Sequence, residues 1–294
     1  MSKVKLGVIG GSGIYEIDGV QDGQWISIET PFGRPSDEIY TGVLNDVDVA
    51  FIPRHGRGHV HNPSNVPYLA NIWALKLLGV TDVIALSACG SLNENLKPGD
   101  FVLVDQYIDN TYKREKTFFS RECVAHVSLA DPVCNRMVEF CKEAMENLQL
   151  NYHPTGTYIT MEGPQFSTKA ESQLYREKWG CDVIGMTNMP EAKLAREAEI
   201  CYASVAMVTD FDCWHPDHEN VEVADIITTL SQNASAAKNL IIEVTKNLSE
   251  KREKCEHGCD HALEYAIITD QSNISLEEQR ILNPIAGRLF KRNS

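Results

Sequence analysis

The segment at residues 208–219, VTDFDCWHPDHE, places four acidic side chains, two histidines and a cysteine at the end of an apolar run. Such a cluster is typical of a metal site, of a catalytic pair of carboxyl groups, or of a solvated loop that follows a buried strand. It contains neither a Cys-x-x-Cys nor a His-Glu-x-x-His pattern, and a proline separates its two histidines. These absences argue against a metal site and leave two alternatives, a functional carboxyl pair formed by Asp210 and Asp212 or a solvated loop after a buried strand.

A second group of metal-binding residue types lies in CEHGCDH at residues 255–261. Three residues separate Cys255 from Cys259, and this spacing lacks the second cysteine pair of a zinc knuckle. The segment therefore does not predict a zinc knuckle. A disulfide, a pair of free thiols and a metal clip all remain open for these two residues.

Two polar turns carry residue types that bind anions. GGSG at residues 10–13 lacks the last glycine of a dinucleotide-binding fingerprint and the Gly-Lys-Ser/Thr of a P-loop. Its main-chain N–H groups and the hydroxyl of Ser12 suit a phosphate, and a plain turn explains it equally well. PRHGRGH at residues 53–59 gathers two arginines and two histidines in an acidic chain. An arginine fork matches phosphate oxygens, so Arg54 and His55 are the stronger candidates for an anion site.

Small, polar or aromatic side chains also lie at three further predicted strand ends. The segments are SACGS at residues 87–91, MEGPQFSTKAES at 161–172 and GMTNMPEAKLA at 185–195. Small residues let a ligand approach the main chain, and an aromatic ring stacks on a flat base. A small-residue turn and a core phenylalanine are the structural alternatives. The side chains that these segments would present to a ligand are Ser87, Ala88, Cys89, Phe166, Met186 and Thr187.

Short apolar runs that alternate with helical patterns must position these residues. Strands are predicted over residues 3–11, 49–56, 82–90, 101–109, 156–164, 181–188 and 201–212, and helices over 64–78, 132–147, 168–179, 191–199, 223–248 and 275–291. This alternation predicts an α/β fold, a single domain with a central mixed β-sheet covered by helices, followed by residues 249–294 as a linker and helical extension. Open α/β sheets bind ligands at the carboxyl ends of their strands.

The composition excludes several classes of function. The 294 residues carry a net charge of −14, which argues against a nucleic-acid partner or an anionic membrane surface. No apolar run is long enough to span a membrane, and the first residues show no secretory signal. With nine cysteines, an odd number, the chain is expected to work in the reducing cytoplasm.

Six motifs follow one another in a recognisable order: GVIGGSG, PRHGRGH, ACGSL, MEGPQFSTKAES, MTNMPEAKLARE and VTDFDCW. Through them, residues 4–247 resemble the purine nucleoside phosphorylases of the trimeric type, and within these the branch that acts on 5′-methylthioadenosine. The resemblance implies a purine nucleoside phosphorylase-like fold and a pentosyltransferase of purine and methionine salvage. Inorganic phosphate, the co-substrate, would displace adenine and give 5-methylthioribose 1-phosphate, and no cofactor is implied. The implied assembly is a homotrimer with active sites at its subunit interfaces.

The resemblance also assigns roles to residues motif by motif. The phosphate site would comprise Ser12, Arg54, His55, Ser87, Ala88 and Thr187. The nucleoside would contact Met186 at the ribose, Phe166 at the base, and also Cys89 and Thr209. The methylthio pocket would be lined by Val221, Val223, Ile226 and Ile227, which equally suit the apolar face of a helix. His126 of a neighbouring subunit would close the 5′ end of the pocket.

The carboxyl pair fits the chemistry of that reaction. Cleaving an N-glycosidic bond develops negative charge on the departing purine, and a proton given to its N7 stabilises that charge. Asp210 is the candidate donor, and it needs a raised pKa, which burial or a neighbouring charge provides. Asp212 would lie on the same side if the chain stays extended, raising that pKa and accepting a hydrogen bond from a 6-amino group. Two aspartates therefore favour adenine over a 6-oxopurine.

Three other functions remain open. A 6-oxopurine nucleoside phosphorylase and a methylthioinosine phosphorylase would use the same motifs on a different base. A nucleoside-binding protein without turnover would keep the pocket but lose Asp210 or Arg54, and both residues are present.

Overall fold

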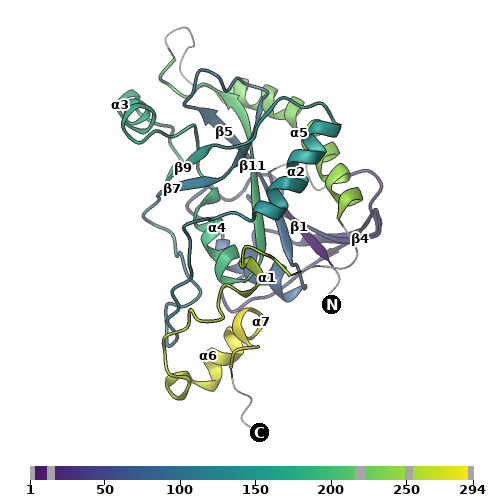
Figure 1. Ribbon diagram of the computed structural model, residues 1–294, viewed down its shortest axis with the longest axis vertical. Coiled ribbons are helices and arrows are strands. Elements are labelled where there is room, and N and C mark those ends of the chain that lie inside the picture. Colours follow the sequence, from purple (N-terminus) through teal and green to yellow (C-terminus); the bar gives the residue numbers. More distant parts are fainter. Residues whose placement is uncertain (1–3, 12–16, 216–222, 249–253, 291–294) are drawn as a thin grey trace.

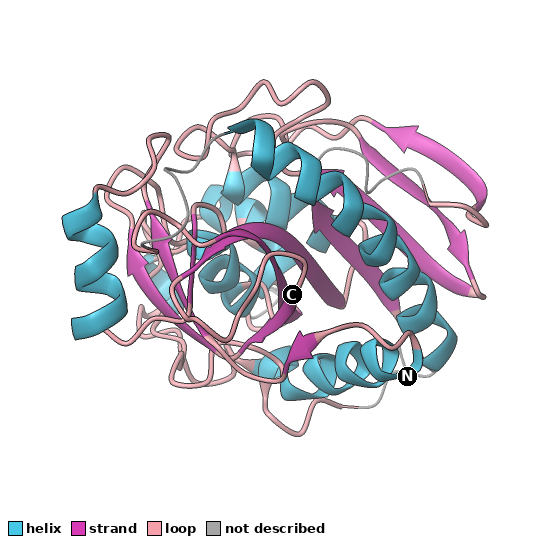
Figure 2. Cartoon of the chain, turned by 90° about the horizontal axis from the view of Figure 1, so that it is seen from above, coloured by secondary structure: helices cyan, strands magenta, loops and turns pink. Residues whose placement is uncertain are grey.

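The computed structural model describes residues 4–11, 17–215, 223–248 and 254–290. A mixed β-sheet crosses the molecule, and helices cover both of its faces (Figure 1 and Figure 2). The strands are β1 (Lys5–Gly10), β2 (Gln21–Ile26), β3 (Ile39–Leu44), β4 (Val47–Pro53), β5 (Asp82–Ser91), β6 (Phe101–Val104), β7 (Gln106–Asn110), β8 (Tyr152–His153), β9 (Thr157–Met161), β10 (Val183–Gly185) and β11 (Cys201–Asp210). The helices are α1 (Tyr68–Leu77), α2 (Asn135–Asn147), α3 (Lys169–Gln173), α4 (Asn188–Glu197), α5 (Val223–Asn247), α6 (Leu276–Ile281) and α7 (Asn283–Ala286).

The two longest strands, β5 and β11, form the centre of the sheet. They run parallel over almost their whole length, and every residue of β11 except its last is buried. On its other edge β5 pairs first with β1, in parallel, and then with β10, antiparallel. The full order on that side is β2-β3-β4-β1-β5-β10-β9-β7, while β11 continues to β6 and β8. The predicted fold class, an α/β domain with a mixed sheet covered by helices, is confirmed.

Two hydrophobic cores fill the space between the sheet and its helices. One core joins α1 and α4 to the sheet and includes Trp73 and Tyr202. The other joins α2 and α5 to the opposite face and includes Met137 and Ile241. Continuous apolar strands of this kind are typical of a sheet that is buried on both faces. None of the described helices is both long and apolar enough to cross a membrane.

Several predicted elements have different limits in the structure. The strand expected over 101–109 is two strands, because the chain changes partners at Asp105: β6 pairs with β11, and β7 pairs with β9. The helix expected over 275–291 is two short helices, with Pro284 in the first turn of the second. Strands β2, β3 and β8 were not predicted from the sequence. Most of β2 is polar and exposed, so it carries no apolar pattern.

The last described segment packs against the rest of the chain. Helices α6 and α7 lie beside α1 (Figure 1), and the indole N–H of Trp73 donates a hydrogen bond to the carbonyl of Ile281 at 2.9 Å. The same segment reaches residues 124–126, where Ala125 pairs with Ile267 in an isolated β-bridge.

Candidate active site

The edge of β5 changes partner at the point where the candidate residues lie. Strand β1 pairs with β5 only up to Ala85, and β10 pairs only with Gly90 and Ser91. The stretch between them, residues 86–89, pairs on that edge with neither strand. Main-chain groups of this stretch are not used by the ladder on that edge, so they are available to side chains or to a ligand, and we call residues 86–89 the switch point of β5. Three predicted site residues, Ser87, Ala88 and Cys89, occupy this stretch.

Arg54 reaches this stretch from the end of β4. Its side chain is 2% exposed, and its Nη1 donates to the carbonyl of Leu86 at 2.9 Å. The guanidinium fork holds Glu191, with Nε–Oε2 at 2.8 Å and Nη2–Oε1 at 3.0 Å. A longer bond of 3.5 Å joins Nη2 to the carbonyl of Ile9. A guanidinium has five N–H groups, so these contacts leave one on Nη1 for a ligand.

The prediction that the fork of Arg54 faces phosphate is wrong, because Nε and Nη2 donate to Glu191. Glu191 occupies the fork instead and also accepts a hydrogen bond from the hydroxyl of Tyr202 at 2.9 Å. A buried arginine needs such a partner, because an isolated charge in the core is costly. Glu191 lies within a motif that the sequence analysis quoted, but its partner is 137 residues away along the chain. Sequence spacing gave no signal for this pair.

Three hydroxyl groups gather next to this arginine. Ser87 Oγ lies 3.4 Å from Thr187 Oγ1 and 3.2 Å from the phenolic oxygen of Tyr158. All three side chains are buried, at 5%, 5% and 0% exposure. Tyr158 passes Gly185 so closely that a Cβ there would lie 1.7 Å from the phenolic oxygen. Two predicted phosphate ligands are therefore brought together, Ser87 from β5 and Thr187 from the N-terminal end of α4.

His55 follows Arg54 and is held in one orientation. Its Nδ1 lies 2.8 Å from the carbonyl of His61, and its ring stacks on His59 at a centroid distance of 4.3 Å. Burial lowers the pKa of His55 to about 4, so the ring is neutral near pH 7. A neutral ring donates Nδ1–H to the carbonyl of His61 and leaves Nε2 as an acceptor. His55 therefore adds no positive charge to an anion site at that pH.

Asp210 and Asp212 lie together where β11 ends. Asp210 Oδ1 accepts a hydrogen bond of 2.8 Å from the main-chain N–H of Asp212, and its Oδ2 accepts one of 2.8 Å from the hydroxyl of Thr209. The chain does not stay extended beyond Asp210, because Asp212 has a left-handed φ of 49°. The turn, rather than the strand alternation considered in the sequence analysis, brings Asp212 back beside Asp210.

Both carboxyl groups have raised pKa values. Burial is the main cause for Asp210, the negative charge of Asp212 adds to it, and the hydrogen bonds from Thr209 and Asp212 oppose it. Burial is also the main cause for Asp212. A raised pKa makes a carboxyl group a better proton donor near neutral pH. Among the described residues, no group of three or more metal-ligating side chains gathers around this pair.

Glycine 90 makes room for this carboxyl pair. A Cβ at Gly90 would lie 2.9 Å from Asp210 Oδ1 and 3.3 Å from the Cβ of Asp212. The hydroxyl oxygen of Thr209 also lies 3.1 Å from the carbonyl oxygen of Cys89, as an alternative acceptor for its proton, which links the carboxyl pair to the switch point of β5. The residues predicted to bind phosphate and the carboxyl pair predicted to bind the base are thus connected through β5.

The segments around Met186 and Phe166, which the resemblance places at the nucleoside, are held by contacts with distant residues. Arg114 donates to the carbonyls of Met186 and Met189 at 2.6 Å each, and fixes the turn into α4. Phe166 is 43% exposed, so its ring is accessible to a ligand. Cys213 Sγ donates to the carbonyl of Ser167 at 3.3 Å, which joins the Phe166 segment to the turn after β11. The sequence analysis did not single out Arg114, whose contacts span distant motifs.

Several predicted residues lie outside what the structure describes. They are Ser12 and Val221, together with the side chains of Val223, Ile226 and Ile227. His126 is described and exposed, and its main-chain N–H donates to the carbonyl of Ala266 at 2.9 Å.

Comparison with known proteins places this geometry in a family. The sequence model of the phosphorylase superfamily matches residues 5–246. The chain belongs to this superfamily. It is 58% identical to S-methyl-5′-thioadenosine phosphorylase of Cereibacter sphaeroides, covering 98% of this chain and 99% of the relative. It is 52% identical to the enzyme of the same name from Rhodospirillum rubrum, covering 97% of both chains.

Solved structures of this superfamily have the same fold. A methylthioadenosine phosphorylase from an antarctic soil metagenomic library superposes with a TM-score of 0.91 at 45% identity, covering 97% of this chain and 99% of that one. Methylthioadenosine phosphorylase from Schistosoma mansoni, in complex with adenine, superposes with a TM-score of 0.85 at 36% identity, covering 90% and 99%. The resemblance inferred from the six motifs is therefore confirmed at the level of the family and its fold.

Proposed function

We propose that this protein catalyses the phosphorolysis of 5′-methylthioadenosine to adenine and 5-methylthioribose 1-phosphate. The observation that carries the proposal is the carboxyl pair at the end of β11, in which Asp212 is buried and Asp210 is half-buried. The names of relatives with 58% and 52% identity over nearly the whole chain support the same substrate. The enzyme is a pentosyltransferase of the purine nucleoside phosphorylase type, acting in purine and methionine salvage.

The carboxyl pair acts on the departing base. A phosphate oxygen attacks C1′ of the ribose, the bond from C1′ to N9 breaks, and its electron pair passes into the purine ring. Asp210 in its acid form gives a proton to N7, so that adenine leaves as a neutral molecule. Asp212 accepts a hydrogen bond from the 6-amino group, which a 6-oxo group cannot donate. This division of roles follows from two neighbouring carboxyl groups in different environments.

Phosphate binds at the switch point of β5, next to the sugar. The remaining Nη1–H of Arg54 and the hydroxyls of Ser87 and Thr187 point to this role, together with His55, Ala88 and Ser12. Because Glu191 neutralises Arg54 and His55 is neutral, hydrogen-bond donors contribute more to holding phosphate than net positive charge. Inorganic phosphate is a co-substrate, and the proposal requires no further cofactor.

The ribose and base contact a second set of side chains. Met186 lies against the ribose, and Phe166 covers the base beside Cys89 and Thr209. The methylthio group contacts Val221, Val223, Ile226 and Ile227, none of which can hydrogen-bond a 5′-hydroxyl.

The proposed assembly is a cytoplasmic homotrimer. His126 is exposed on a segment that main-chain contacts hold in place, so its side chain is available to a neighbouring subunit. There it closes the 5′ end of the pocket. Nine cysteines suit the reducing conditions of the cytoplasm.

A substrate panel tests the proposal. The protein is incubated with phosphate and, separately, methylthioadenosine, adenosine, inosine and methylthioinosine, and the free base is quantified. We expect methylthioadenosine to give the highest kcat/KM and the two 6-oxopurine nucleosides to give the lowest. Faster release of hypoxanthine than of adenine would contradict the assignment of the base. Absence of any free base from all four nucleosides would show a binding protein rather than an enzyme.

A further inference from the structure

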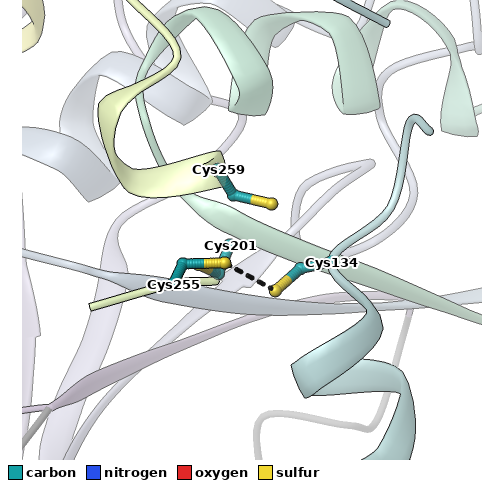
Figure 3. Close-up of side chains that lie close together, drawn as sticks. All are labelled: Cys134, Cys201, Cys255 and Cys259. Atoms are coloured by element: carbon teal, nitrogen blue, oxygen red, sulfur yellow. Dashed lines mark hydrogen bonds between the residues drawn. The ribbon is translucent and has the colours of Figure 1, made fainter. Parts of the chain in front are cut away.

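Four cysteines from distant parts of the sequence bring their sulfur atoms together (Figure 3). Cys134 caps the start of α2, and Cys201 is the first residue of β11. Cys255 and Cys259 come from the C-terminal segment. The four sulfur atoms all lie within 4.8 Å of one another, and each side chain is at most 1% exposed. This cluster is separate from the carboxyl pair, which lies at the opposite end of β11.

The spacing of the sulfur atoms fits a metal ion. A tetrahedral zinc ion binds thiolates at about 2.3 Å, which places neighbouring sulfur atoms roughly 3.8 Å apart. In this cluster the sulfur atoms of Cys134 and Cys255 are 3.7 Å apart. A disulfide instead requires a separation of about 2.0 Å. A small contraction of the cluster would suffice to bind zinc.

The main chain holds these cysteines in place. The N–H of Cys134 donates to the carbonyl of Tyr202 at 2.7 Å, so the start of α2 is tied to the start of β11. Gly258 has a left-handed φ of 72°, and its N–H donates to the carbonyl of Cys255 at 3.0 Å. This turn brings Cys255 and Cys259 to the same side. The ligand atoms are therefore positioned by secondary structure rather than by side-chain packing alone.

A charged pair and a helix terminus lie beside the cluster. Arg136, two residues after Cys134, forms an ion pair with Asp82, and Asp82 pairs with Cys201 across the sheet. The start of α2 adds the positive end of a helix dipole beside Cys134.

We propose that this protein binds one structural zinc ion through Cys134, Cys201, Cys255 and Cys259. Four thiols release four protons as they bind Zn²⁺, and no oxidation or reduction is involved. With four protein ligands the site is closed, so the ion has a structural rather than a catalytic role. The sequence left a disulfide, free thiols and a metal clip open for Cys255 and Cys259, because no second cysteine pair lies nearby in the sequence; the fold supplies that pair as Cys134 and Cys201.

The ion would fasten the C-terminal segment to the α/β sheet. Beyond Cys259 this segment pairs Ile267 with Ala125 and accepts a hydrogen bond from the N–H of His126. Zinc would thereby stabilise the segment that carries His126. The metal site itself does not depend on the proposed function.

Metal analysis of the full-length protein tests the proposal. The protein is purified without an affinity tag and without chelators, under reducing conditions, and zinc and iron are measured by mass spectrometry. We expect one zinc per chain in the wild type. Cys255→Ser and Cys134→Ser should each lose most of it. Cys141→Ser is the matched control, because Cys141 is a fully buried thiol on the same helix α2 outside the cluster, and it should keep the full content.

Cobalt substitution keeps the test valid if a variant fails to fold. Metal-free wild-type protein is titrated with Co²⁺, and we expect thiolate-to-cobalt charge-transfer bands that saturate at one cobalt per chain. Zinc should then displace cobalt. Wild-type protein without zinc that also takes up no cobalt would overturn the proposal. A zinc content in Cys255→Ser equal to that of the wild type would also overturn it. The same holds if alkylation of the denatured protein shows that these cysteines are paired as disulfides.

Discussion

The main-chain N–H of Asp212 donates a hydrogen bond of 2.8 Å to Oδ1 of Asp210, so the two carboxyl groups are coupled through the backbone of one turn. This bond favours the ionised form of Asp210, whereas burial and the charge of Asp212 favour its acid form, and the latter effects are larger. The turn therefore fixes the direction of the Asp210 carboxyl group without removing its ability to donate a proton.

Replacing Asp210 by asparagine tests its role in activating the base. The amide has nearly the same shape and can donate a hydrogen bond, but it cannot transfer a proton to N7. We expect kcat for methylthioadenosine to fall by about 10²–10⁴-fold, the usual contribution of general acid catalysis. Phosphate affinity, measured by calorimetry, should change little. Equal losses in kcat and in phosphate affinity would argue against a role at the leaving group.

Gly90→Ala tests whether the position of Asp210 is critical. The new Cβ would lie 2.9 Å from Asp210 Oδ1, closer than side-chain atoms normally approach, so the carboxyl group must move. A displacement of about 1 Å in an active site can reduce the rate about 10²-fold, and we expect a loss of this size in kcat/KM. Steady-state kinetics with methylthioadenosine would measure it.

Gly7→Ala is the matched control for that substitution. A Cβ at Gly7 would lie 2.9 Å from both Val80 Cγ1 and Val83 Cγ2, inside the core and away from the carboxyl pair. It should lower the midpoint of thermal unfolding while kcat stays near the wild-type value. A similar loss of kcat in both variants would indicate that packing strain, rather than the position of Asp210, explains the effect.

The buried pair of Arg54 and Glu191 should behave as a unit. Arg54→Met leaves Glu191 buried without its partner, and we expect a loss of about 3–5 kcal/mol in the free energy of unfolding. The double variant Arg54→Met/Glu191→Met removes both charges and should recover most of that stability. Urea denaturation of the two single variants and the double variant measures the coupling.

Activity separates the two roles of Arg54. Even if the double variant regains stability, it should bind phosphate weakly, because it lacks the one Nη1–H of Arg54 that is left for a ligand. A double variant that restored both stability and phosphate binding would show that Arg54 only supports the fold. Purely additive stability losses would show that the two charges do not stabilise each other.

The sequence is sufficient to predict the main strands of the central sheet and the places where they end. Apolar runs predicted β1, β4, β5 and β11, and the polar residues after them indicated where a ligand would bind. The carboxyl pair was found in this way, because Asp210 directly follows a buried run. Motif order then identified the family.

The sequence could not predict contacts that depend on how distant segments meet. Glu191 and Arg54 form a pair only because the packing of α4 against α1 and β11 brings Glu191 to the residue that follows β4. The four cysteines come from three separate regions, so no spacing pattern connects them. The change of pairing partner at Asp105 also depends on which strands lie beside this segment, and the residues of the segment do not specify those strands.

Glu197 predicts a pH dependence of stability that is independent of the active site. Burial raises the pKa of this carboxyl from 4.5 to about 7, although Phe118 N–H and the Thr117 hydroxyl oppose the shift. Between these values the folded protein holds a proton that the unfolded chain has lost, so stability falls as the pH rises through this window. Glu197→Gln removes the effect. We expect this variant to be more stable than wild type above about pH 7, by up to about 3 kcal/mol.

The advantage of Glu197→Gln should shrink as the pH falls and vanish near pH 4.5, the ordinary pKa of the group. Urea denaturation of both proteins across this range, at one protein concentration, measures it. Glutamine suits the site, because its oxygen can accept from Phe118 N–H and its amide can donate to the Thr117 hydroxyl. Glu94→Gln is the control, since the side chain of Glu94 is 70% exposed and its replacement should leave the pH profile unchanged. Parallel profiles for wild type and Glu197→Gln would show that this carboxyl group does not hold its proton in the folded protein.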